Sequence, residues 1–210
     1  MARKRKPKME YRYYEIPAGS PVLALLGDKW VQNYGRDIDY LHFHNHLEVG
    51  FCYYGEGTVT FKEDIPFDGN MFTVIPKNFP HTTTSAGDSV SYWEWLFIDA
   101  DKFLREVYKD NPRMAQKVLD RVNRRAHFVR VQDKPQIGAL VQQIIGCMRE
   151  RKEFYLEEVK GLTLALLLQV ARWNREEAEK TEFEAGNSSL ITPAIDYISE
   201  CCDRPIKVEE

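Results

Sequence analysis

Residues 41–57, LHFHNHLEVGFCYYGEG, hold three of the five histidines of the chain within five positions. His42, His44, His46 and Glu48 follow one another at every second position. In a straight strand the four would share one face, but His42 and Glu48 would lie about 20 Å apart at roughly 3.3 Å per residue. Ligands of a zinc-like ion lie only about 2.0–2.2 Å from it. A common site therefore requires a bend in this stretch, and we expect His46 to lie at its tip, away from the other three.

A fourth ligand is expected from residues 70–81, NMFTVIPKNFPH, where a strand and a Pro-Lys-Asn-Phe-Pro turn precede His81. Three imidazoles and one carboxylate suit iron, manganese, nickel, copper or zinc, so the set does not identify its metal. Two alternatives stay open beside a metal site. One is a polar pocket without metal, and the other is a histidine-rich strand without a chemical role.

Residues 20–98 are typical of strands. Short runs rich in β-branched and aromatic residues alternate with clusters of Gly, Asn, Asp and Pro, as in HLEVGFCYY, GTVTFKE, MFTVIP and VSYWEWLFI. Such spacing favours an all-β sandwich or barrel. We predict a single antiparallel β-barrel over this range.

Beyond Asp99 the apolar residues recur at helical spacing, and we predict that residues 101–180 are helical and pack on the outside of the barrel. The helix expected over residues 155–179 contains GLTLALLLQVARW, which is apolar around most of its circumference. A helix of this kind is buried on several sides. Either it lies between the barrel and a second helix, or one side meets a second copy of the chain. The two stripes concerned are Leu162, Leu166 and Trp173, and Leu164, Leu167, Leu168 and Ala171.

The charge of the chain argues against a protein built mainly to bind nucleic acid. Five cations fall within the first eight residues, and without them 24 basic residues face 32 acidic ones, a net charge of −8. Affinity for nucleic acid depends largely on cations that neutralise phosphates. We expect residues 1–19 to form a basic N-terminal arm, whose cationic first eight residues are either a solvated, mobile terminus or a contact to DNA. No apolar run is long enough for a membrane helix, no secretory signal opens the chain and no CxxC pair occurs, so a cytoplasmic location is expected.

The last thirty residues indicate a change of domain. Residues 181–189 are polar and small, which is typical of a linker. Residues 190–210, LITPAIDYISECCDRPIKVEE, predict one amphipathic helix and the opening of another. Two short elements cannot form a core, so we expect the sequence to be a fragment of a longer protein.

The histidine stretch resembles a known motif. Read as His42-x-His44-x3-Glu48-x6-Gly55, it is similar to the first motif of the cupin family. The resemblance implies that His42, His44 and Glu48 are metal ligands or polar residues of a pocket. Cupin motifs alone imply a small barrel with a pocket, not a particular activity.

Residues 70–81 resemble the second cupin motif, which implies that His81 is the fourth ligand. Asn70 and Asn78 stand where cupins usually have glycine, and Asn tolerates the same turns. The implied fold class is mainly β plus α: a cupin barrel, that is a double-stranded β-helix or jelly roll, followed by a helical dimerisation region.

The order of the parts resembles that of AraC/XylS-type transcriptional regulators, over about residues 20–210. In that family an N-terminal domain that binds an effector and dimerises precedes two helix-turn-helix units. The implied layout is a basic arm (1–19), a cupin barrel (20–98), a helical dimerisation region (99–180), a linker (181–189) and a truncated start of the DNA-binding domain (190–210). Both recognition helices lie beyond the sequence, so DNA contacts are expected only through the missing C-terminal domain.

The resemblance implies a sensor of a sugar or another small metabolite that is not an enzyme, that dimerises through the helix at residues 155–179 and that has no membrane contact. Aromatic faces with a few polar groups suit such a ligand. The expected pocket residues are His42, His44, Glu48, Tyr54, Phe72, His81, Trp93 and Trp95. The divalent metal of such a site, if present, would be Zn, Ni, Fe or Mn. The alternative is a metal-dependent cupin enzyme, a dioxygenase or isomerase, which the complete ligand set favours.

Overall fold

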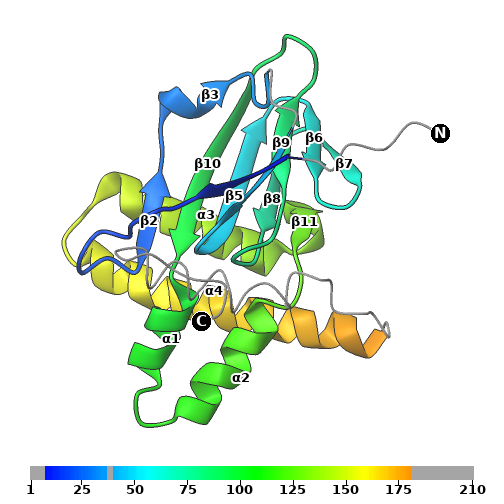
Figure 1. The fold of residues 1–210 in the computed structure, drawn as a ribbon. Coiled ribbons are helices and arrows are strands. Elements are labelled where there is room, and N and C mark those ends of the chain that lie inside the picture. The colour runs from blue at the N-terminus through cyan, green and yellow to red at the C-terminus, as the bar shows by residue number, and fades with distance from the viewer. Residues whose placement is uncertain (1–7, 37–39, 181–210) are drawn as a thin grey trace, which may run out of the picture.

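β-Sheets and helices form separate layers in this protein (Figure 1). The computed structural model describes residues 8–36 and 40–180. The expected linker and the expected start of a DNA-binding domain lie outside these residues, as do the first seven residues of the basic arm. None of the described helices is both long enough and apolar enough to cross a membrane.

The strands are short, and most of them fall in the range predicted from the sequence. They are β1 (Lys8–Arg12), β2 (Val22–Leu25), β3 (Val31–Gln32), β4 (Tyr40–His44), β5 (Leu47–Tyr54), β6 (Gly57–Thr60), β7 (Asp64–Phe67), β8 (Met71–Val74), β9 (Thr82–Ser85), β10 (Ser91–Ile98) and β11 (His127–Arg130). The helices are α1 (Ala100–Val107), α2 (Pro112–Val122), α3 (Pro135–Glu150) and α4 (Tyr155–Lys180), with short 3-10 turns at Asp28–Trp30 and Val131–Asp133.

Within the described residues the strands form three sheets and no closed barrel. The largest has the order β11-β8-β5-β10-β2, with β3 also paired to β10, and it is antiparallel. An antiparallel three-stranded sheet has the order β7-β6-β9, and β1 pairs with β4 in parallel. The chain passes from β5 to β6 at Gly55, whose φ of 111° favours glycine, and so moves from one sheet to another. The fold is therefore mixed β and α, and the single closed barrel that was predicted is not seen.

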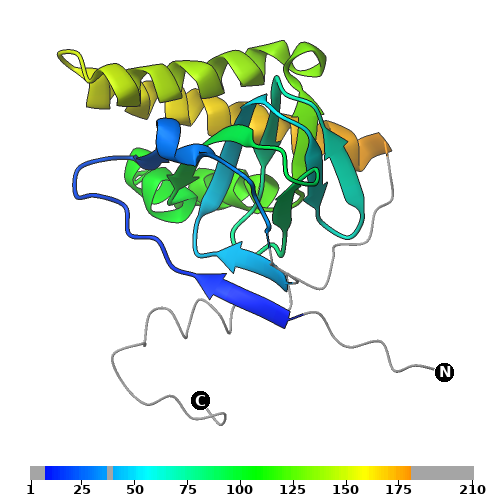
Figure 2. The same ribbon diagram turned by 90° about the horizontal axis from the view of Figure 1, so that it is seen from above.

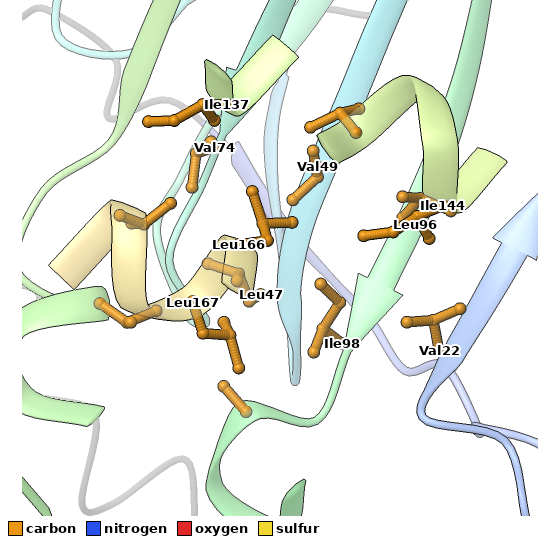
Figure 3. Close-up of a cluster of buried hydrophobic side chains, with 14 of the residues drawn as sticks. Val22, Leu47, Val49, Val74, Leu96, Ile98, Ile137, Ile144, Leu166 and Leu167 are labelled. Atoms are coloured by element: carbon orange, nitrogen blue, oxygen red, sulfur yellow. The ribbon is translucent and has the colours of Figure 1, made fainter. Parts of the chain in front are cut away.

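Each long strand sends alternate side chains into two different cores. Leu47, Val49 and Phe51 of β5 belong to a cluster that faces the helices, as do Leu96 and Ile98 of β10. Figure 3 shows this cluster, in which Ile137 and Ile144 of α3 and Leu166 and Leu167 of α4 meet side chains of the sheet. The other cluster contains Cys52, Val59, Phe67, Met71, Trp93, Trp95 and Phe97. This alternation follows from the two-residue period of a strand.

The first two helices begin at residues whose side chains cap them. The side chain of Asp99 accepts a hydrogen bond from the backbone N–H of Lys102 at the start of α1, and Asn111 does the same for α2. Pro112 and Pro135 occupy the first turns of α2 and α3, where no intrahelical N–H bond is lost. Figure 2 shows α3 and α4 on one side of the large sheet, with β1 and β4 on the other. The helices thus pack on one face of an open sheet.

Two strands lie outside the predicted strand region. β11, expected to be helical, pairs with β8 at the edge of the large sheet. Its sequence, HFVR, is rich in strand-forming residues but too short to stand out among helices. β1 lies inside the predicted N-terminal arm. It pairs with β4, and Tyr11 packs on Phe43 with ring centroids 5.2 Å apart.

Both apolar stripes of α4 are largely covered within one subunit. α4 packs against α2 and α3. Leu166 and Trp173 of one stripe are buried, and so are Leu167 and Ala171 of the other. Leu162, Leu164 and Leu168 remain half-buried. The apolar surface that α4 leaves exposed for a second copy of the chain is therefore smaller than the sequence indicates.

Candidate metal centre

The four predicted ligands lie together between the sheets. His42 and His44 come from β4, Glu48 from β5 and His81 from the residue before β9. One ligand atom from each lies within 4.8 Å of the other three. Their convergence agrees with the prediction, whereas their role as ligands stays a proposal.

The predicted bend separates β4 from β5 and is held by Asn45. Its side-chain Oδ1 accepts from the backbone N–H of Tyr14 at 2.9 Å, and its Nδ2 donates to the carbonyl of Tyr14 at 2.9 Å. His46 follows it, and its Nε2 lies 3.0 Å from the carbonyl oxygen of Tyr14. His46 is thus engaged with the N-terminal segment and takes no part in the cluster, as expected.

A second turn positions His81. Asn78 has a φ of 60°, a left-handed conformation that Asn tolerates, and its backbone N–H donates to the carbonyl of His44 at 2.8 Å. The Nδ1 of His81 lies 2.8 Å from the carbonyl of Phe79. When Nδ1 donates its hydrogen there, Nε2 carries the free lone pair, and such a hydrogen bond is the usual support of a metal-binding histidine.

The nitrogen and oxygen atoms of the cluster are close but poorly matched as hydrogen-bond partners. The Nε2 of His44 lies 2.6 Å from Oε2 of Glu48, and the Nε2 of His81 lies 3.3 Å from Oε1 of Glu48. Nevertheless both Nε2 atoms and Oε1 of Glu48 are buried without a hydrogen-bond partner, as is Nδ1 of His42. Buried polar atoms without partners are costly. Because all four residue types are good ligands of transition metals, an ion at their centre would satisfy these atoms.

The electrostatics of the cluster favour a neutral His42 and an ionised Glu48. Burial, followed by the nearby charge of His81, lowers the pKa of His42 to about 2. Burial alone would raise the pKa of Glu48, but the nearby charges of His81 and His44 bring it well below its usual value. A neutral imidazole and a carboxylate are the forms that bind metal.

The cluster lines a cavity of about 280 Å³. Of the four aromatic residues predicted to line it, Trp95 does so. Trp93 stacks on Trp95, with centroids 5.0 Å apart, but lies behind it, covered by Phe67. The predictions for Tyr54 and Phe72 are wrong as well. Tyr54 is 49% exposed at the end of β5, and Phe72 belongs to the core that faces the helices, because alternate residues of a strand face opposite sides.

The rest of the wall comes from residues that sequence reasoning missed. Arg12 and Tyr14 reach the cavity from the N-terminal segment, and Trp30 and Tyr34 reach it from the segment around β3. Phe97 lies two residues beyond Trp95 on the same face of β10, so the alternation of β10 would have found it. The pairing of β1 with β4, which places Arg12 beside His44, has no signal in the sequence.

Comparisons with known proteins show the fold. No protein-family model matches the sequence, and no curated protein matches it. The structure is similar to that of ToxT from Vibrio cholerae O395 bound to (E)-4-(8-methylnaphthalen-1-yl)but-3-enoic acid, with a TM-score of 0.50, 10% identity, and coverage of 90% of this chain and 68% of that one.

Two further structures are similar at lower TM-scores. Another structure of ToxT from Vibrio cholerae O395 has a TM-score of 0.49 and 11% identity, and the match covers 90% of this chain and 65% of that one. The AraC-like transcriptional activator CuxR has a TM-score of 0.39 and 14% identity, and the match covers 62% of this chain and 42% of that one. The chain thus spans about two thirds of ToxT and less than half of CuxR, and at these identities the likeness concerns the fold alone.

Proposed function

We propose that this chain is the ligand-sensing part of an AraC-type transcriptional regulator, with a cupin-type β-fold that holds a divalent transition metal in its cavity. One observation carries the proposal: His42, His44, Glu48 and His81 converge in a cavity between two sheets, and helices cover the outer face of the larger sheet. The fold shared with ToxT, which is bound to a small carboxylic acid in one of its structures, supports a small-molecule effector.

The metal would be held by the Nε2 atoms of His44 and His81, a carboxylate oxygen of Glu48 and a ring nitrogen of His42. When bound, it would supply a Lewis-acidic position at which an oxygen atom of a ligand is anchored. The carbonyl of Phe79 orients His81, and the burial of His44, Glu48 and His81 would keep water away from that side of the ion.

A metal-dependent cupin enzyme remains the second candidate, because the ligand set of three histidines and one glutamate is complete. The helices behind the large sheet favour the sensor. In AraC-type regulators this region dimerises, and Leu164 and Leu168 of α4 lie four residues apart and half-buried. The proposed domains beyond α4 are a linker (181–189) and the start of a DNA-binding domain (190–210).

The experiment uses the full product of the gene and the DNA upstream of that gene. In a mobility-shift assay the sensor proposal predicts specific retardation of the DNA, and removal of metal by a chelator should change the affinity several-fold. Absence of any specific binding, together with metal-dependent consumption of oxygen or isomerisation of a substrate, would favour the enzyme instead.

Dimerisation is tested on the 210-residue chain. Sedimentation at micromolar concentration should show a dimer, and Leu168→Glu should shift it towards monomer, because a two-fold interface places the same residue on both subunits. The control is Val90→Glu, since Val90 is exposed in the loop before β10 and not on α4. A chain that is monomeric before substitution would contradict the proposed dimer.

A further inference from the structure

With an ion bound, the cavity would present a net positive charge to its ligand. Glu48 is the single carboxylate among the described residues that line it, and the histidines already engage it. A divalent ion on three neutral imidazoles and one carboxylate leaves a centre of net charge +1. Since opposite charge stabilises a bound group most strongly where water is excluded, an anion is favoured over a neutral molecule.

Arg12 lies at the edge of this centre. In the parallel pair of β1 and β4, Arg12 is the partner of His44 and Glu10 is the partner of His42, so their side chains lie on the side of the cluster. Arg12 donates from Nε and Nη2 to the same oxygen of Glu10, at 3.0 and 2.9 Å. The side chains of the pair are 31% and 44% exposed, and ion pairs of this kind contribute little to stability. Arg12 can therefore exchange Glu10 for a carboxylate of a ligand.

The remaining wall offers aromatic faces and a hydrogen-bond donor. Trp30, Tyr34 and Trp95 line the cavity, and Tyr34 meets Trp95 edge to face with centroids 6.1 Å apart. The Nε1–H of Trp30 is buried without an acceptor, while the hydroxyl of Tyr34 already donates to the carbonyl of Trp30. A buried donor without a partner is costly, and a ligand with acceptor oxygens would satisfy it.

The size of the cavity limits the ligand. At about 280 Å³ it falls just below the range of roughly 300–1,000 Å³ that is usual for drug-sized molecules. A long acyl chain or an oligosaccharide does not fit this volume.

We propose that the ligand of this cavity is a small carboxylic acid, bound as its anion, whose oxygens meet the metal and the guanidinium of Arg12 together while its body lies against Trp30, Tyr34 and Trp95. This inference rests on the metal site of the proposed function, and it narrows the effector from any small metabolite to a small carboxylate. Arginine suits the role because its fork binds both oxygens of a carboxylate.

The test uses the purified 210-residue chain loaded with Co²⁺, whose visible absorption reports the ligands of the ion. Two matched pairs of probes are titrated, pyruvate against pyruvamide and salicylate against salicylamide. Each amide keeps the shape of its acid without the charge. We expect at least one acid to change the spectrum with an affinity at least tenfold above that of its amide.

Variants separate the contribution of Arg12 from a general effect of charge. Arg12→Gln should remove at least tenfold of the preference for the acid and leave Co²⁺ binding unchanged. Arg130→Gln is the matched control, because Arg130 is an exposed arginine that donates to both oxygens of Asp68 outside the cavity. Arg130→Gln should change neither the preference for the acid nor the affinity for Co²⁺.

The outcomes distinguish this inference from the proposed function. A chain that binds Co²⁺ but shows no preference for either acid overturns the carboxylate ligand and leaves the metal site standing. The same holds if Arg12→Gln and Arg130→Gln lose the preference equally. A chain that fails to bind Co²⁺ overturns both proposals.

Discussion

His42 and His81 are joined by a reciprocal pair of backbone hydrogen bonds. The N–H of His42 donates to the carbonyl of His81 at 2.8 Å, and the N–H of His81 donates to the carbonyl of His42 at 2.9 Å. Their rings lie side by side, with centroids 4.4 Å apart. This bridge ties β4 to the start of β9, and so the backbone holds two candidate ligands together. We infer that the site is formed before an ion arrives.

The first prediction separates the ligands from their neighbour. His44→Ala should weaken the binding of Zn²⁺ or Co²⁺ by more than about 100-fold, because even supporting partners of metal ligands account for about 10–100-fold. His46→Ala should leave the affinity within a few-fold, since His46 contacts the carbonyl of Tyr14 and not the cluster. Isothermal titration measures both. Loss of binding in the His46 variant alone would show that the wrong histidine was chosen.

The second prediction concerns Glu94, a fully buried carboxylate on the helix-facing side of β10. It accepts hydrogen bonds from the backbone N–H of Gly27 at 2.9 Å, from the hydroxyls of Tyr53 and Tyr92 at 2.7 and 2.8 Å, and from Arg149 of α3. It thereby joins the sheet, α3 and the segment that leads to Trp30.

Glu94→Gln replaces one acceptor oxygen by a donor and should lower the free energy of unfolding by about 1.5–3 kcal/mol, the range for hydrogen bonds to charged groups. Urea unfolding followed by fluorescence measures the loss. Glu150→Gln, at an exposed pair with Lys152, is the control and should change little. Equal effects in the two variants would show that the Glu94 network does not stabilise the fold.

Much of the site follows from the sequence, and the parts that do not have physical reasons. The two-residue period and the ligand chemistry placed His42, His44, Glu48 and His81 together and His46 apart. The aromatic residues of the cavity wall are harder to predict, because the sequence of a single strand does not show which of its two faces points into the cavity. Phe72, for example, faces the helices instead. Partner choice between distant strands depends on tertiary packing, so the place of Arg12 beside His44 was not predictable.

The third prediction is a loss of stability in acid caused by His127. Its ring stacks on Trp173 at 3.6 Å between centroids, and its Nε2 donates to Oδ1 of Asn174. Burial lowers the pKa of His127 from 6.5 to about 4. The unfolded chain therefore takes up this proton at a higher pH than the folded one, so stability is complete above pH 6.5 and falls as the pH drops towards 4.

Chemical unfolding of the metal-free chain between pH 7 and pH 4.5 checks this dependence. In that window His127 should contribute a slope of at most about 1.4 kcal/mol per pH unit. The variant His127→Gln should show a smaller slope, while His42 and His46 titrate alike in both proteins and cancel in the difference. Identical slopes would contradict the role of His127.

The fourth prediction uses two glycines. A Cβ on Gly50 of β5 would clash with the ring of Trp95 and lie 2.8 Å from Oγ1 of Thr73. Gly50→Ala should therefore displace the Trp95 wall and cost about 1–3 kcal/mol, as overpacking does. Gly146→Ala, in the middle of α3 with open space around it, should instead stabilise by roughly 0.5–1 kcal/mol. Thermal unfolding measures the loss of stability in the first variant and the gain in the second. A Gly50→Ala variant with unchanged stability and unchanged tryptophan fluorescence would contradict the close packing of Trp95.

The central claim is that His42, His44, Glu48 and His81 surround one ion, and X-ray absorption of the Co²⁺-loaded chain tests it most directly. The account predicts a first shell of nitrogen and oxygen atoms at about 2.0–2.2 Å, with the outer-shell scattering of three imidazole rings. In the His44→Ala variant that imidazole signal should fall by one third or vanish with the ion. A first shell of oxygen atoms alone, without imidazole scattering, would contradict the claim.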